Sequence, residues 1–274
     1  YRRQRQMCIR DSLIIVSGLG FIVWWDLWDK FRKVLRKELS PSRVFRVLRL
    51  QSKLVLTMTG ILVFSGAFLV FIFESGNPST LKGAPLGTKL MASFFQSVTT
   101  RTAGFYTMDQ SLLSTPTVII SLLWMFIGGS PMGTAGGVKT TTIAVLILSI
   151  AAYLQGKKDV EVYGRRIRES YLRSAMVVAG TSVLILFTMT VLLSAVMPGV
   201  DLADVLYEIT SAGATVGLSR GLTPQLNVAG KWIVILTMYL GRIGPLTLGT
   251  AVVVRVRNRP GSTTHLGEED IMIG

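Results

Sequence analysis

The chain has 274 residues, of which half are hydrophobic and only 16% are charged, and its mean hydropathy is positive. This composition excludes an ordinary soluble domain and indicates a polytopic membrane protein. The net charge is +14, which in a soluble protein would suggest nucleic-acid binding. Here the basic residues gather in three clusters between apolar segments, and this distribution disfavours nucleic-acid binding. The positive-inside rule predicts that these clusters are cytoplasmic loops. They cover residues 30–53, 157–173 and 255–259.

The first segment of the chain is polar and basic and has no periodicity. Residues 1–12 are therefore interpreted as a leader that is not native to the protein. The apolar segment 13–25 that follows has only thirteen residues, whereas a helix needs about 20 to cross the bilayer core. We therefore expect residues 13–53 to hold the end of an incomplete span and a cytoplasmic loop.

The next apolar segment, 54–73, has twenty residues without a charge and is followed by Glu74. It predicts a helix that crosses from the basic loop to the outside. After a loop rich in Gly and Pro, the segment 90–100 is apolar but too short to cross. We expect this second segment to enter the membrane and return to the same side.

Residues 112–156 carry a single charge, Lys139, over about twice the length of a span. Because the flanking loops are predicted on opposite sides, we expect one crossing that contains a stretch of non-helical backbone. The sequence GGSPMGTAGG at 128–137 predicts this stretch. Irregular backbone is tolerated at membrane depth only where protein or a water-filled cavity satisfies its polar groups. The alternative, a polar loop between two separate spans, conflicts with the distribution of basic residues.

The remaining apolar segments repeat the same order. Residues 174–197 predict a full span, 201–212 a second re-entrant helix, and 232–254 a last crossing. The predicted fold is an all-α polytopic membrane protein in which a span, a re-entrant pore helix, a filter loop and a span occur twice. The two units cover residues 54–156, with a broken second helix, and 157–255, and residues 256–274 are expected to form a cytoplasmic tail.

An internal duplication supports this division. Thr102 and Gly104 in TTRTAGF align with Thr215 and Gly217 in AGATVGL, at an offset of 113 residues that also aligns Gly128 with Gly241. A Thr-x-Gly strand after a short helix is typical of an ion filter, in which backbone carbonyl oxygens replace the water around the ion. The partly negative C-terminal end of each re-entrant helix would favour a cation.

Three charged residues near these segments need an explanation. Arg242 lies near the middle of the last predicted span, where a charge costs about 2.5–3.5 kcal/mol, and its aligned position is Gly129. A gate built from Arg242 and the loop is one hypothesis, and pairing with a carboxylate or carbonyls to fix helix packing is the other. For Glu208 we favour a structural role behind the filter over ion binding. Arg101 is expected to point away from the axis and to bond the pore-helix scaffold, because a cation facing the ions would block conduction.

The sequence resembles the Trk/Ktr/HKT superfamily of potassium transporters, most closely the bacterial Ktr pore-forming membrane subunit, over residues 13–274. The resemblance rests on SVTTRTAGF (97–105), FIGGSPMGTAGGVKTTT (126–142), ATVGLS (214–219), LGRIGPLTL (240–248) and the ending EEDIMIG. It implies four span, pore-helix, span repeats around one pore in a single chain. Residues 13–30 would then end the second repeat, so this chain alone is expected not to conduct selectively.

The resemblance also implies a set of site residues. The filter residues would be Thr100, Arg101, Thr102, Ala103 and Gly104 in the third repeat, and Gly213, Ala214, Thr215, Val216 and Gly217 in the fourth. The gate residues would be Gly128, Gly129, Ser130, Pro131, Gly133, Thr134, Gly136, Gly137, Lys139 and Arg242.

Partners are implied in the same way. The family resemblance implies a homodimer, surrounded by lipid in the bacterial plasma membrane, and a cytoplasmic ring of regulatory subunits that bind ATP, ADP or NAD. The chain itself has neither a Walker A motif nor a strand followed by GxGxxG, and no metal-ligand spacing. We therefore expect no cofactor, and K⁺ as the transported ion, with Na⁺ as a candidate activator or co-ion.

Three functions are compatible with the sequence, and none is enzymatic. The favoured one is channel-like cation uptake. The second is a sodium-coupled or sodium-selective secondary transporter, because discontinuous helices also occur in carriers. The third is a membrane protein fragment without a role in transport.

Overall fold

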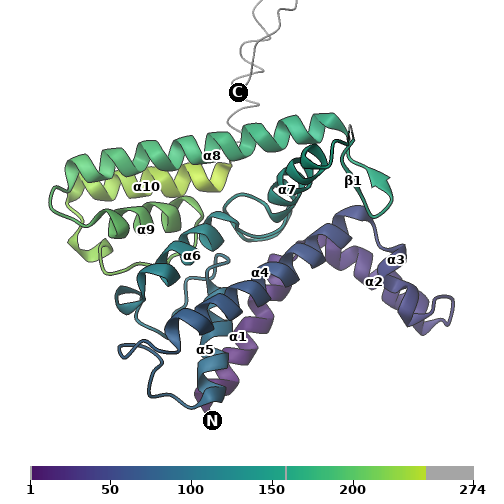
Figure 1. Ribbon diagram of the computed structural model, residues 1–274, viewed down its shortest axis with the longest axis horizontal. Coiled ribbons are helices and arrows are strands. Elements are labelled where there is room, and N and C mark those ends of the chain that lie inside the picture. The colour runs from purple at the N-terminus through teal and green to yellow at the C-terminus, as the bar shows by residue number, and fades with distance from the viewer. Residues whose placement is uncertain (1, 158, 245–274) are drawn as a thin grey trace, which may run out of the picture.

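The computed structural model describes residues 2–157 and 159–244, and these residues are almost entirely helical (Figure 1). The helices are α1 (Arg2–Gly18), α2 (Phe21–Leu35), α3 (Val44–Val47), α4 (Leu50–Glu74), α5 (Leu86–Thr99), α6 (Thr115–Phe126), α7 (Thr140–Leu154), α8 (Glu169–Val196), α9 (Leu202–Gly213) and α10 (Val228–Ile243). Short 3-10 turns occur at η1 (Pro41–Arg43), η2 (Gln110–Leu112) and η3 (Thr223–Gln225). A two-stranded antiparallel hairpin, β1 (Glu161–Val162) and β2 (Arg165–Arg166), lies in the second basic loop.

Two of the described helices, α4 and α8, are long and apolar enough to cross a membrane. α4 contains the predicted span 54–73, and α8 contains the predicted span 174–197 except for its last residue, Met197. Large apolar side chains on both helices are exposed, including Phe64, Phe68 and Phe187. Such side chains are expected where the outer surface of a protein meets lipid rather than water.

The two predicted re-entrant segments form the short helices α5 and α9. At 14 and 12 residues they are shorter than a membrane crossing. In Figure 1, α9 lies beside α8 and α10, and α5 packs against α4. Each short helix is therefore held by the long helix of its own repeat and ends where a candidate filter begins.

The crossing that was predicted to be irregular is divided into α6 and α7, with residues 127–139 outside regular helix. The base of this loop is closed by two backbone hydrogen bonds, from Gly128 N–H to the Val138 carbonyl and from Val138 N–H to the Phe126 carbonyl, both 3.0 Å. Because α6 and α7 are each shorter than a span, this arrangement agrees with one interrupted crossing rather than two separate ones.

The first two helices of the chain are bent relative to each other, whereas the sequence predicted only the end of one span. α1 and α2 are separated by a break at Leu19 and Gly20, and the axes of Met7–Gly18 and α2 differ by 97°. Gly20 has a φ of 82°, a left-handed conformation that side chains disfavour, which explains why the chain turns here. α1 also runs without interruption across the leader boundary expected at residue 12.

The C-terminal crossing is described only in part. α10 begins at Val228, four residues before the expected start, and ends at Ile243. The rest of the predicted crossing to residue 254, the basic cluster 255–259 and the tail 256–274 lie outside the described residues.

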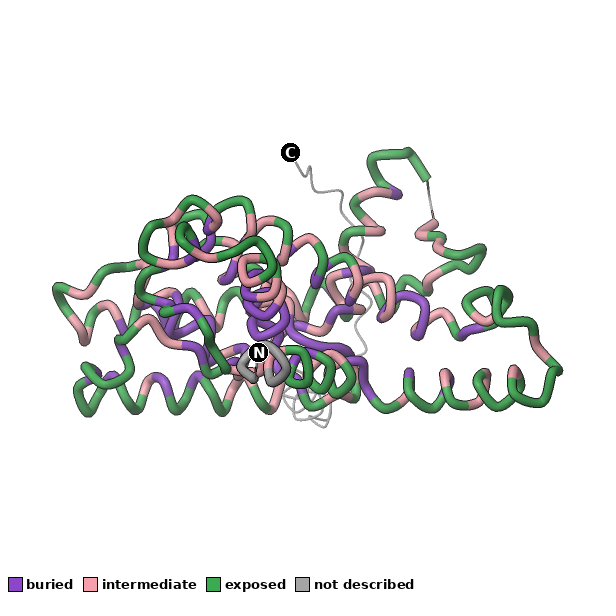
Figure 2. Tube along the Cα trace, turned by 90° about the horizontal axis from the view of Figure 1, so that it is seen from below, coloured by how far each residue is buried: buried purple, intermediate pink, exposed green. Residues whose placement is uncertain are grey.

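The buried core joins the two repeats. One apolar cluster contains Val70 of α4, Met125 of α6 and Tyr207 of α9, together with Val216 after α9. Figure 2 shows the buried residues gathered toward the middle of the molecule and exposed ones along its periphery. The two predicted units therefore pack against each other at the level of the candidate filters.

Candidate functional site

The two candidate filters, defined as the first filter segment (100–104) and the second filter segment (213–217), share one backbone conformation. Thr102 and Gly104 have φ values of 67° and 72°, and their aligned residues Thr215 and Gly217 have values of 55° and 89°. The intervening residues do not have positive φ. Alternation of left-handed and right-handed residues turns successive N–H groups to one side and carbonyl groups to the other. Each segment can therefore present a row of carbonyl oxygens.

The amide side of each segment is held by its own short helix. Ala103 N–H donates to the Thr99 carbonyl at 3.1 Å, and Val216 N–H donates to the Ser211 carbonyl at 2.8 Å. The hydroxyl of Ser211 also accepts from Gly217 N–H at 3.2 Å. Among the described residues, no donor bonds the carbonyl oxygens of 101–104 or 214–217. The Ala214 and Val216 oxygens lie close to Gly136 and Gly104 instead.

The two filter segments approach each other at their glycines. A Cβ added at Gly104 would lie 2.5 Å from the Val216 carbonyl oxygen, closer than real Cβ contacts. A Cβ added at Gly217 would lie 3.7 Å from the Gly104 Cα. Segments separated by more than a hundred residues are therefore neighbours.

The candidate gate loop (128–137) packs against the second filter segment. A Cβ added at Gly136 would lie 2.1 Å from the Thr215 hydroxyl oxygen and 2.6 Å from the Ala214 carbonyl oxygen. Within the loop, a Cβ added at Gly128 would lie 1.8 Å from the Gly136 carbonyl oxygen. Glycine is thus required at these positions for close approach, and the loop lies directly beside the filter.

Two cations bond consecutive carbonyls of the gate loop. The Arg242 guanidinium, on α10, donates to the Thr134 carbonyl at 3.0 Å, and the Lys139 ammonium donates to the Ala135 carbonyl at 2.7 Å. Arg242 therefore contacts the gate loop, which also contains its aligned residue, Gly129. The alternative hypothesis was that Arg242 pairs with carbonyls to fix helix packing. It is also compatible with this bond, because the Thr134 carbonyl that Arg242 contacts belongs to the gate loop.

The other side of the gate loop contacts the break between α1 and α2, which was not predicted to belong to the site. Ser130 N–H donates to the Gly18 carbonyl at 3.0 Å, and Phe21 N–H donates to the Met132 carbonyl at 3.2 Å. A Cβ added at Gly20 would lie 2.4 Å from the Pro131 carbonyl oxygen. The signal that could have indicated this contact is the Gly-Leu-Gly sequence inside an apolar segment.

Arg101 is buried, with 6% of its surface exposed, and its side chain points toward the helices behind the first filter segment. One guanidinium nitrogen lies 3.4 Å from the Thr59 hydroxyl of α4, and the side chain lines a small space with Ile14 and Gly18 of α1. The expected bond to the scaffold therefore goes to a spanning helix rather than to the re-entrant helix.

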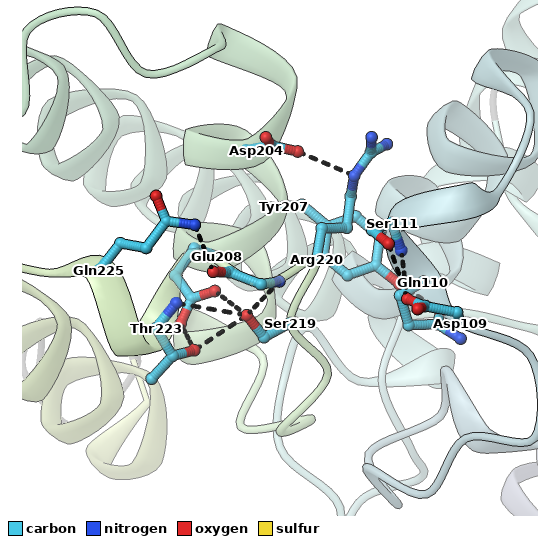
Figure 3. Close-up of polar contacts among 11 residues, drawn as sticks. Asp109, Gln110, Ser111, Asp204, Tyr207, Glu208, Ser219, Arg220, Thr223 and Gln225 are labelled. Atoms are coloured by element: carbon cyan, nitrogen blue, oxygen red, sulfur yellow. Dashed lines mark hydrogen bonds and ion pairs between the residues drawn. The ribbon is translucent and has the colours of Figure 1, made fainter.

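Glu208 holds the chain that leaves the second filter segment. Its carboxylate accepts hydrogen bonds from the Ser219 hydroxyl at 2.7 Å and from the Thr223 hydroxyl (Figure 3). Nearby, Arg220 forms an ion pair with Asp204 at 2.8 Å. These contacts are those of a structural carboxylate, the role that we favoured over ion binding.

Comparisons with known proteins show to which family the chain belongs. A family model described as a cation transport protein, TrkH, matches residues 7–259. The Ktr system potassium uptake protein B of Bacillus subtilis is 39% identical over 235 residues, covering 86% of this chain and 50% of its own. The potassium/sodium uptake protein NtpJ of Enterococcus hirae is 36% identical over 267 residues, covering 96% and 56%. The chain thus spans about half the length of these relatives.

A solved structure has the same fold. The potassium transporter TrkH from Vibrio parahaemolyticus matches with a TM-score of 0.68 and 17% identity, covering 90% of this chain and 51% of that one. At this identity the likeness concerns the fold alone. The match over most of the chain, with relatives above 35% identity, shows that the chain belongs to the TrkH family of cation transport proteins.

Proposed function

We propose that this chain is the C-terminal part of a potassium uptake protein that conducts the ion past backbone carbonyl oxygens. The observation that carries this proposal is the matching left-handed conformation at Thr102 and Gly104 and at Thr215 and Gly217. The names of the relatives, which include potassium uptake and potassium/sodium uptake proteins, support the choice of ion. Because the chain spans half of those relatives, the activity belongs to the complete protein.

The gate loop would close the path beside the second filter segment. Its contact with Thr215 through Gly136, and its bonds to Arg242 and to Gly18, support a loop that is held in place from two sides. Opening would then require that at least one of these sets of bonds breaks. We also propose that residues 54–156 form the third repeat and residues 157–255 the fourth. Each range contains most or all of a long helix, α4 or α8, followed by a short helix and a filter segment.

Partners remain part of the proposal. Relatives named as components of a Ktr system support a membrane subunit that works with other components. We propose a homodimer in the bacterial plasma membrane and a cytoplasmic ring of regulatory subunits that bind ATP, ADP or NAD. The basic residues of 30–53 and 157–173 would offer this ring a charged surface.

A sodium-coupled carrier is the second candidate function. The observation that favours it is the contact between two interrupted helices, α1–α2 and α6–α7, because broken helices surround the substrate site of many carriers. Such a carrier would show saturable co-transport, with uptake of one ion depending on the other. The paired carbonyl rows favour the channel-like function instead.

The experiment is growth of a potassium-uptake-deficient bacterium at low potassium. It uses the full-length protein, expressed with and without a regulatory subunit, and the variant Gly217→Ser. Rescue by the wild type that is lost with Gly217→Ser is the expected result. Failure of the wild type to rescue growth, despite membrane expression with its regulatory subunit, would argue for the carrier.

A further inference from the structure

A buried cluster of three polar side chains connects the two short helices behind the filter segments. Gln96 lies on α5, Tyr207 on α9, and Gln110 in η2, on the chain that joins the first filter segment to α6. All three are almost completely buried, at 0%, 0% and 1% exposure. We propose that this cluster, the glutamine–tyrosine bridge, sets the spacing of the two filter segments and so contributes to ion selectivity. The inference rests on the proposed function.

Gln110 is the centre of the bridge, and its side-chain amide is fully used. Its Oε1 accepts from Gln96 Nε2 and from the Tyr207 hydroxyl, both at 2.8 Å. Its Nε2 donates to the Met108 carbonyl at 2.7 Å and to Gln96 Oε1 at 3.2 Å. Figure 3 shows Tyr207 extending from α9 to Gln110. Two donors and two acceptors are therefore satisfied in a site closed to water.

Each end of the bridge continues directly to a filter segment. The Gln96 backbone carbonyl accepts from Thr100 N–H, the first amide of the first filter segment, at 3.3 Å. Tyr207 lies one helical turn before Ser211, whose carbonyl and hydroxyl accept from Val216 and Gly217. A shift of α5 relative to α9 would therefore move one carbonyl row relative to the other.

The bridge is suited to this task because it is buried and neutral, and each of its side-chain polar atoms has a hydrogen-bond partner. A satisfied polar network in a low-dielectric site fixes one arrangement, whereas a purely apolar contact tolerates sliding. The filter segments approach each other closely at Gly104, Val216 and Gly217, through backbone atoms. Since selectivity depends on the placement of carbonyl oxygens, small changes at the back of the filters are expected to appear as a changed ion preference.

The test measures the ratio of K⁺ to Na⁺ uptake in proteoliposomes that contain the full-length protein. Tyr207→Phe removes only the bridging hydroxyl, and Gln96→Met removes the partner amide at similar volume. Tyr239→Phe, on α10, is the matched control because its ring is 63% exposed. Gly217→Ser reports on the filter assignment itself. Thermal unfolding in detergent is measured for each protein.

The expected result is a fall in the uptake ratio of about three- to tenfold for Tyr207→Phe, from the loss of one buried hydrogen bond. Gln96→Met is expected to give a similar fall, and the double variant little more, because both act on one network. Tyr239→Phe is expected to leave the ratio unchanged. If Tyr207→Phe does not yield folded protein, Gln96→Met tests the same inference.

Two results would overturn the inference, and they differ from failure of the proposed function. One is an unchanged ratio in folded Tyr207→Phe and Gln96→Met while Gly217→Ser lowers it. The other is an equal loss of K⁺ and Na⁺ uptake together with lower thermal stability, which is a purely structural effect. If Gly217→Ser also leaves the ratio unchanged, the filter assignment fails, and the bridge loses its role with it.

Discussion

Single glycines in the candidate site serve two separate physical requirements. Gly104 and Gly217 both have positive φ, which costs a residue with a side chain roughly 1–2 kcal/mol. A Cβ added at Gly104 would in addition meet the Val216 carbonyl oxygen. A Cβ added at Gly217 would come no closer than 3.7 Å to its nearest neighbour, the Gly104 Cα. The two aligned glycines are therefore not equivalent.

This difference predicts the outcome of replacing each glycine by alanine. Gly104→Ala should reduce potassium uptake and selectivity more strongly than Gly217→Ala, because only the first change displaces the neighbouring filter segment. Uptake of K⁺ and Na⁺ by the two full-length variants in the same membranes checks it. Equal defects would mean that the close approach of Gly104 to Val216 does not matter for function.

Arg242 gives a second prediction at the scale of one residue. Arg242→Ala should raise the uptake rate or uncouple it from the regulatory subunit, because the bond to the Thr134 carbonyl that holds the gate loop is lost. Lys231→Ala, an exposed cation on the same helix, is the control and should behave like the wild type. Lower uptake together with reduced thermal stability would favour the helix-packing role of Arg242.

At the scale of elements, length and patterning predicted most of the helices. The uncharged segment 54–73 and the glycine-rich stretch 128–137 lie where α4 and the break between α6 and α7 are found. The bend between α1 and α2 was not predicted, because Gly18 and Gly20 within an apolar segment are equally compatible with a straight helix. Only the contact with Pro131 and Met132 reveals why the chain turns there.

The bend can be tested with a matched pair of glycines. Gly20→Ala should destabilise the protein by about 2 kcal/mol or more, because it combines a positive φ with a Cβ 2.4 Å from the Pro131 carbonyl oxygen. Gly60→Ala in the middle of α4 meets nothing within 4 Å and should be neutral or stabilise the helix by up to about 1 kcal/mol. Thermal unfolding of the two variants in detergent measures this difference. Equal stabilities would show that the bend is not constrained by the gate loop.

Contacts between elements were the least predictable part of the candidate site. The internal duplication aligns Thr102 with Thr215, and the positive φ of both residues agrees with this alignment. The partners of Arg101 on α4 and of Gln110 on α9 could not be inferred, because hydrogen bonds between distant segments leave no periodic signal in one sequence.

For the whole molecule, membership in a family of cation transport proteins confirms two sequence-based predictions. The chain is part of an all-α polytopic membrane protein, and it is not an enzyme. Its basic clusters predict the orientation of the spans, with residues 30–53 and 157–173 inside and the loop after Glu74 outside. This orientation can be measured independently of transport.

Cysteine labelling provides that measurement. In a Cys8→Ser background, which removes the single cysteine of the sequence, Gly76→Cys should react with a membrane-impermeant maleimide added to intact cells. Ser40→Cys, an exposed position in the first basic cluster, should react only after the cells are opened. The reverse pattern would invert the predicted topology and place the gate loop on the outer side of the filter.

We propose that backbone carbonyls of both filter segments bind the transported cation. The most direct measurement is the anomalous scattering of Tl⁺, used in place of K⁺, in crystals of the full-length protein. Peaks are expected at coordination distance from the carbonyl oxygens of residues 101–104 and 214–217. Peaks at side-chain carboxylates such as Glu208, with none beside the filter carbonyls, would contradict it.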